Sequence, residues 1–154
     1  HLRQFLSRLK GLSLIGKRPM SANIFLDTNI IIYGYSEDEP DKQQCAIECI
    51  QAGTPWISTQ VLNEAINTLR RKFQLDYGQI DAVVNELTQQ LQVAIVSITT
   101  IKNALAIADR YQYSYFDSLI IASALEMKCD YLYSEDLQAG QSINNQLILV
   151  NPFL

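Results

Sequence analysis

Short apolar runs alternate with longer amphipathic stretches from residue 23 to residue 150. This alternation constrains the fold more than any other feature, because short buried strands joined by helical crossovers form parallel sheets with helices on both faces. The expected strands are Asn23–Asp27, Trp56–Ser58, Val93–Ile98, Asp130–Tyr133 and Gln146–Val150. The expected helices are Pro40–Gln51, Thr59–Phe73, Tyr77–Leu91, one that is capped by Thr99 or Thr100 and ends at Ala108, and Asp117–Met127. The sequence therefore predicts an α/β fold with a mainly parallel sheet.

Residues 1–22 differ from the rest of the chain. They carry five of its 12 basic residues and no acidic residue, and apolar residues from Leu2 to Leu12 recur at helical spacing. Residues 1–19 fit a basic amphipathic helix, a docking arm, or residues outside the true domain that would then start at Met20. We therefore divide the chain into a basic segment of unknown role, residues 1–22, and one domain, residues 23–154.

The domain is acidic, with seven basic and 16 acidic residues and a formal charge of −9 over residues 23–154. An acidic domain is an unusual partner for nucleic acid unless cations mediate the contact. The charge balance is therefore a weak indication of metal use.

Histidine and cysteine usage excludes several kinds of site. His1 is the only histidine, so a Ser-His-Asp or Cys-His mechanism has no base, and a histidine-rich metal site has no ligands. Cys45, Cys49 and Cys129 are odd in number and form no C-x-x-C pair, which argues against a disulfide framework and favours a reducing cytoplasm. No apolar run approaches the roughly 18 residues that span a bilayer, and we see no secretory signal, so we expect a soluble cytoplasmic protein with no membrane partner.

Two acids follow expected strands. Asp27 ends the first strand, and Asp136 comes directly after the strand that ends at Tyr133. The carboxyl ends of parallel strands form the edge at which α/β folds bind ligands. Each acid also fits a turn or a solvated loop, and Glu135 fits a solvated loop better than a site.

Two further acids lie on expected helices. Asp117 stands three and four residues before Ile120 and Ile121 and shares their inward face, although an acid in a first helical turn is also favoured by the helix dipole. Glu64 borders the apolar stripe of its helix, where a lone glutamate is usually solvated. Carboxylates that converge repel one another, and a divalent cation such as Mg²⁺ or Mn²⁺ would relieve the repulsion.

Four motifs resemble those of the PIN domains, and among them the VapC-like toxins of bacterial toxin–antitoxin pairs. The resemblance runs from about Asn23 to Phe153. It rests on Phe25-Leu26-Asp27-Thr28-Asn29, on Leu62-Asn63-Glu64, on Tyr115-Phe116-Asp117-Ser118-Leu119-Ile120, and on the stretch from Cys129 to Leu137. Each motif alone is weak, but the four in this order are specific. The resemblance implies a PIN-like fold, a three-layer α/β/α sandwich around a mainly parallel sheet.

The resemblance also implies a site and a reaction. Its acidic quartet for Mg²⁺ or Mn²⁺ would be Asp27, Glu64, Asp117 and Asp136, which would be both catalytic and metal-binding, with Asn29 and Ser134 as supporting polar residues. Toxins of this type cut single-stranded or looped RNA, often dimerise, and are silenced by a cognate antitoxin. We therefore expect a metal-dependent endoribonuclease that leaves 3′-hydroxyl and 5′-phosphate ends, with an antitoxin partner and a homodimeric state.

Two groups of residues could grip RNA. Arg70, Arg71 and Lys72 form the only basic cluster of the domain, although a solvated helix end explains them better. The aromatic residues before Asp117 could stack on unpaired bases or simply pack, and the sequence favours neither. They are Tyr111, Tyr113, Tyr115 and Phe116.

Other functions fit less well. An aspartyl phosphotransferase would need an acid two residues after Asp27, where Asn29 stands. Nucleotide-binding α/β folds would carry a glycine-rich phosphate loop, and neither of the usual patterns occurs. A PIN fold that binds RNA or protein without cutting is the remaining alternative.

Overall fold

A computed structural model describes residues 22–154, and the expectations for residues 1–19 lie outside this range. The strands are β1 (Asn23–Leu26), β2 (Thr54–Ser58), β3 (Gln92–Ala94), β4 (Tyr131–Tyr133), β5 (Ser142–Ile143) and β6 (Leu147–Val150). The helices are α2 (Thr28–Tyr33), α3 (Pro40–Gln51), α4 (Thr59–Arg71), α5 (Tyr77–Gln90), α6 (Ile98–Tyr111) and α7 (Tyr115–Glu126). Each of the first three strands is followed by two helices, and β4, β5 and β6 follow one another, so the predicted exchange of strands and helices holds as far as α7.

The strands form one sheet of six in the order β3-β2-β1-β4-β6-β5. All neighbours are parallel except β5, which pairs antiparallel with β6 at one edge. β1 lies inside the sheet, between β2 and β4. The chain therefore reverses its order at β1, and such a reversal leaves a crevice beyond the carboxyl ends of the strands.

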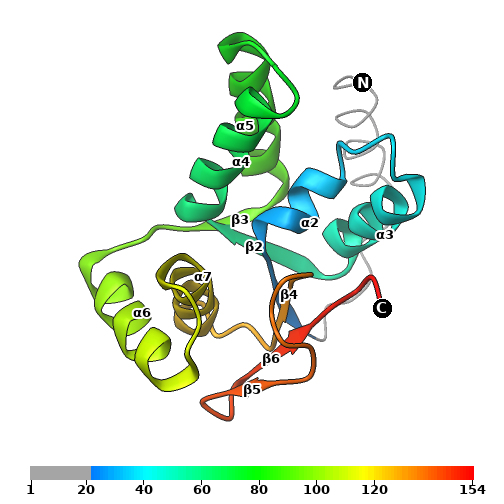
Figure 1. The fold of residues 1–154 in the computed structure, drawn as a ribbon. Helices are drawn as coiled ribbons and strands as arrows, with labels where there is room; N and C mark the ends of the chain where they lie inside the picture. The colour runs from blue at the N-terminus through cyan, green and yellow to red at the C-terminus, as the bar shows by residue number, and fades with distance from the viewer. Residues whose placement is uncertain (1–21) are drawn as a thin grey trace.

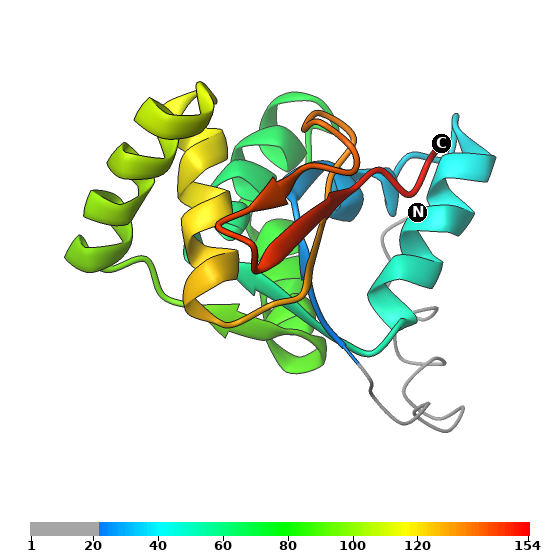
Figure 2. The same cartoon turned by 90° about the horizontal axis from the view of Figure 1, so that it is seen from below.

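Helices cover the sheet on both sides. Seen from below, α6 and α7 lie on one side of the strands and α3 lies on the other (Figure 2). α4 and α5 lie against each other and against β2 and β3 (Figure 1). These layers confirm the predicted α/β/α sandwich around a mainly parallel sheet.

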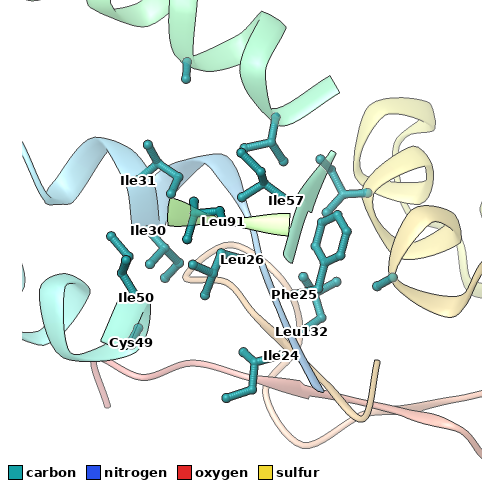
Figure 3. Packing of buried hydrophobic residues seen from close by; sticks show 14 of the residues in the cluster. Ile24, Phe25, Leu26, Ile30, Ile31, Cys49, Ile50, Ile57, Leu91 and Leu132 are labelled. Atoms are coloured by element: carbon teal, nitrogen blue, oxygen red, sulfur yellow. The ribbon is translucent and has the colours of Figure 1, made fainter. Parts of the chain in front are cut away.

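The core forms around β1, whose last three residues are all buried. Phe25 and Leu26 are fully buried, and Figure 3 shows them among side chains from α2, β2 and β4, including Ile30, Ile57 and Leu132. Burying both faces of a strand requires a continuous apolar run, which is the pattern of residues 24–26. The buried strand leaves the polar residues that follow it at the edge of the sheet.

Several element boundaries differ from the predictions. Helix α2 and the short strand β5 were not predicted. β3 ends at Ala94, because the chain turns so that Ser97, and not Thr99 or Thr100, accepts the first capping hydrogen bond of α6. α7 begins at Tyr115 under a cap from Ser114, so Asp117 lies within its first turn. Ser58 caps α4 by accepting from the Val61 N–H.

Two observations bear on the composition. All three cysteines, Cys45, Cys49 and Cys129, are free thiols. The sequence predicts no disulfide framework. No helix within residues 22–154 has the length and apolar character needed to cross a membrane.

Candidate active site

The register of the sheet brings Asp27 next to Ser134. Leu26 of β1 pairs with Tyr133 of β4, so the residues that follow the two strands leave the sheet side by side. The Asp27 N–H donates to the Tyr133 carbonyl over 3.0 Å, which extends the ladder by one step. Two residues that are 107 apart in sequence are thus fixed at one edge by strand pairing alone.

The hydroxyl of Ser134 lies at the centre of the polar contacts. It donates to Asp27 Oδ2 over 2.7 Å and accepts from the Asp136 N–H over 3.1 Å. The side-chain amide of Asn29 donates to Asp136 Oδ2 over 3.0 Å and lies 3.4 Å from Ser134 Oγ. Because Ser134 is only 1% exposed, its hydroxyl holds both aspartates from inside the protein.

Asp27 is also the N-cap of α2. Its Oδ1 accepts from the Thr28 N–H over 2.7 Å, and its backbone is extended while α2 begins at the next residue. Both carboxylate oxygens of Asp27 therefore accept hydrogen bonds, and the side chain is 6% exposed.

Glu64 reaches the same edge from α4. Its Oε2 accepts from the Thr28 hydroxyl over 2.6 Å, and its Oε1 accepts from the Gln60 side-chain amide over 3.0 Å. Thr28 thus links the two acids, with its N–H on Asp27 and its hydroxyl on Glu64. Glu64 is partly buried and borders the apolar stripe of α4, in agreement with the helical spacing of its sequence.

Asp117 belongs to the first turn of α7. Ser114 caps this helix by accepting from the Asp117 N–H over 3.2 Å, and Asp117 itself is half-buried. The two residues that follow in the chain, Ser118 and Leu119, are buried. Packing of α7 therefore fixes the backbone that carries the Asp117 carboxylate.

The pKa values of Asp27 and Asp117 are raised, and charges of the other acids contribute to both. Burial raises the pKa of Asp27 to about 6; hydrogen bonds from Ser134 and Thr28 oppose the rise, and the charges of Glu64 and Asp117 add to it. Burial also raises the pKa of Asp117; Ser114 opposes this rise, and the charges of Asp136 and Glu64 add to it. Each of the four acids therefore feels at least one of the others, so a positive charge placed between them would be stabilised.

The donor set fits a hard divalent cation. Carboxylates and a hydroxyl supply oxygen ligands, which Mg²⁺ and Mn²⁺ prefer. The raised pKa values of Asp27 and Asp117 come mainly from burial, with a smaller contribution from the neighbouring acids. Among the residues that the structure describes, no three Asp, Glu, His or Cys side chains are grouped closely enough to hold a metal as they stand. The cation therefore remains a prediction from the chemistry of these residues.

Hydrogen bonds connect five of the six residues singled out in the sequence, directly or through Thr28, whereas Asp117 is coupled to them only through its charge. Their role in a site stays a prediction. Two other residues of this network were missed. Thr28 and Gln60 both donate to Glu64. The position of Thr28 between Asp27 and Asn29 was a signal, but its contact depends on α2, which the sequence pattern did not predict. Gln60 stands one helical turn before Glu64, a spacing that places the two side chains on one face.

The residues proposed to contact RNA have different surroundings in the structure. Arg70 donates to the Leu75 carbonyl over 3.1 Å and lies 4.8 Å from the ring centre of Tyr77, so it stabilises the end of α4. Tyr111 and Tyr113 bond through their hydroxyls to Asn144 and Gln141, on the β5–β6 side of the molecule. Phe116 is 58% exposed, and its ring lies edge to face against that of Tyr115 at 5.4 Å. Stacking of Phe116 on a base stays a prediction.

A family model for the PIN domain matches residues 24–140. The chain belongs to the PIN domain family. No curated protein matches this PIN domain. The match covers Asp27, Glu64, Asp117 and Asp136, so the family found from the four motifs is confirmed.

Solved structures with the same fold include three from bacterial toxin systems. A toxin–antitoxin complex from Klebsiella pneumoniae has 20% identity and a TM-score of 0.64, over 84% of this chain and 97% of that one. VapBC2 from Rickettsia felis, bound to a promoter DNA fragment, has 18% identity and a TM-score of 0.61, over 82% and 96% of the two chains. VapC20 from Mycobacterium tuberculosis, a toxin that cleaves the sarcin–ricin loop, has 17% identity and a TM-score of 0.58, over 73% and 91%. At these identities the likeness shows a shared fold.

Proposed function

We propose that this PIN domain is a Mg²⁺- or Mn²⁺-dependent endoribonuclease that cleaves RNA phosphodiester bonds and acts as the toxin of a type II toxin–antitoxin pair. The observation that supports the proposal is the hydrogen-bonded network at one sheet edge, in which Thr28 joins Asp27 to Glu64 and Ser134 joins Asp27 to Asp136. Asp117 of α7 is coupled to this network through its charge. Carboxylate centres suit phosphodiester cleavage, because a divalent cation bound there supplies an acidified water and positive charge for the phosphate. The chain offers no histidine in its described residues for another route.

Similar structures support the toxin assignment. The Klebsiella and Rickettsia structures are toxin–antitoxin assemblies, and the Mycobacterium protein cleaves the sarcin–ricin loop, which is RNA. The expected partners are therefore an RNA substrate and a cognate antitoxin. A homodimeric state and a cytoplasmic location remain predictions from the resemblance and the composition.

Each acid of the site has a proposed role in this reaction. Asp27, Asp117 and Asp136 would hold the cation, while Ser134 keeps two of them in place. Glu64, fixed through both oxygens by Thr28 and Gln60, would either bind the cation or orient the attacking water. The water oxygen bonds to phosphorus, the bond from phosphorus to O3′ breaks, and a proton passes to O3′. The products carry 3′-hydroxyl and 5′-phosphate ends.

Removal of divalent cations tests this proposal directly. Purified protein incubated with a mixed RNA pool should cut RNA in Mg²⁺ or Mn²⁺ and should stop when EDTA is added, with activity restored by excess Mn²⁺. Sequencing of the fragment ends should find 5′-phosphates. Ends with 2′,3′-cyclic phosphates would contradict the hydrolytic route, and folded protein that binds no Mn²⁺ in calorimetry would favour an RNA- or protein-binding module without activity.

The hydroxyl of Thr28 gives a second test. Thr28→Val keeps the shape of the side chain but removes the 2.6 Å donor of Glu64, so we expect the rate of RNA cleavage to fall roughly 10-fold, the lower range for partners that orient metal-site residues. Thr28→Ser keeps the hydroxyl and should retain most of the activity. Equal rates for the valine and serine variants would show that the hydroxyl has no part in orienting Glu64.

A further inference from the structure

Glu135 lies between Ser134 and Asp136, two residues of the carboxylate centre. The sequence predicts a solvated loop acid at this position; Glu135 does lie in a loop, but its side chain is only 28% exposed and makes specific contacts. Oε1 of Glu135 accepts from Lys42 Nζ over 2.6 Å, and Oε2 accepts a short hydrogen bond from the Tyr33 hydroxyl. Both oxygens are therefore held, one by α3 and one by the last residue of α2.

The backbone of Glu135 is held as well. Its N–H donates to Asn29 Oδ1 over 3.3 Å, and its carbonyl accepts from Asn151 Nδ2 over 3.4 Å. The four polar groups of this residue thus contact four different residues, which come from α2, α3 and the segment after β6. A loop residue with every polar group bonded has little freedom to move. Because Ser134 and Asp136 are bonded directly to Glu135 along the backbone, their positions are restricted as well.

Lys42 sits in an aromatic setting that favours a fixed position. Its ammonium lies 4.6 Å from the ring centre of Tyr33 and 5.7 Å from that of Phe153, and the two rings meet edge to face at 5.0 Å. Partial burial pushes the pKa of Glu135 upward, but the hydrogen bonds from Lys42 and Tyr33 outweigh it, and the pKa lies below its ordinary value. The pair therefore stays charged and joined at neutral pH.

We propose that Lys42 and Tyr33 are positioning residues, which act through Glu135 to hold Ser134 and Asp136 in the geometry that binds a divalent cation. The inference rests on the proposed function and deepens it. It adds two residues, Tyr33 of α2 and Lys42 of α3, that are not among the four acids and act on them only through Glu135. Partners that lie behind the ligands of a metal site commonly change its affinity when they are removed.

The experiment compares Lys42→Met with Glu39→Gln in otherwise identical protein. Methionine keeps the apolar stem against the two rings and removes the charge. Glu39 is the other carboxylate near Lys42, at 3.9 Å and half-exposed, so Glu39→Gln removes a charge beside Lys42 without touching Glu135. Lys42→Arg restores a cation and tests rescue.

Two readouts separate positioning from plain stability. In metal-free protein, the amides of Glu135 and Asp136 should exchange with solvent about 10-fold faster or more in Lys42→Met, while the amide of Leu132 in β4 keeps its rate. At a temperature where every variant is folded, the dissociation constant for Mn²⁺ in calorimetry should rise roughly 10–100-fold in Lys42→Met and stay unchanged in Glu39→Gln. Lys42→Arg should recover much of the affinity.

Three results would overturn the inference. They are unchanged exchange at Glu135 and Asp136, equal acceleration of Leu132 and the loop amides, and Mn²⁺ affinity that does not respond to Lys42→Met. The exchange measurement needs neither metal nor RNA. A protein whose loop amides respond as expected, but which cuts no RNA, would therefore refute the proposed nuclease while the positioning role stood.

Discussion

Asp117→Asn is expected to lower metal-dependent RNA cleavage by at least about 100-fold, the upper range for residues that only support a metal ligand. The substitution keeps the size of the side chain and its place in the first turn of α7, but removes the charge that would face the cation. Burial raises the pKa of Asp117, and Asp136 and Glu64 repel it, so the loss of this charge should not destabilise the fold. Cleavage rates with saturating Mn²⁺ and a fixed RNA would measure the effect.

Asp109→Asn is a suitable control for that measurement. Asp109 is an exposed acid near the end of α6, the helix that precedes α7 in the chain. Its variant carries the same change in charge and composition and should cut RNA at the parent rate. Normal cleavage by folded Asp117→Asn protein would remove Asp117 from the site and leave the proposed mechanism without one of its three principal ligands.

Asp27→Asn is expected to stabilise the metal-free protein by about 3 kcal/mol at neutral pH while abolishing cleavage. Burial is the main reason that the pKa of Asp27 rises from its ordinary value of 3.8 to about 6. The folded state thus binds this proton more tightly than the unfolded state, so stability falls as pH rises from about 4 to about 6 and the whole loss is present above that range. Asparagine carries no charge and avoids the loss.

Urea unfolding in EDTA at several pH values would measure this difference. The variant and the parent should have similar free energies of unfolding near pH 4. The difference between the two free energies should grow up to about pH 6 and stay constant above it. Mn²⁺ should then stabilise the parent much more than the variant, because only the parent keeps the full ligand set. A parent that is the more stable protein at pH 7 without metal would mean that the hydrogen bonds from Ser134 and Thr28 outweigh burial.

The parts of the fold that were predicted have long or uniform apolar patterns. Helix Pro40–Gln51 and the strands around Phe25 and Leu132 could be found because one face, or both faces, must be apolar to be buried. Helix α2 was missed because its six residues include three consecutive isoleucines, a run that shows no helical period. The strand expected over Val93–Ile98 merges two elements, since its apolar residues continue through a turn whose Ile95 is exposed.

The site shows the same division between local and distant information. Asp27 and Asp136 were singled out from their places after buried strands and Asp117 from its place on the inward face of its helix, whereas Glu64 depended on the family resemblance. The sequence could not reveal that Lys42 holds Glu135, because 93 residues separate them and no local pattern marks the pair. Contacts of this kind depend on the whole sheet and on α2, so they become visible only with the fold.

The place of β1 in the middle of the sheet has a consequence for synthesis. The ribosome synthesises Asp27 before the neighbouring strand β4, and the Ser134 hydroxyl that holds Asp27 follows 107 residues later. At common translation rates that interval is roughly 5–20 s, during which one edge of β1 has no strand to pair with. A nascent chain in this interval lacks both Ser134 and Asp136. The carboxylate centre therefore forms only after these two residues have been synthesised, and no activity that depends on it can begin earlier.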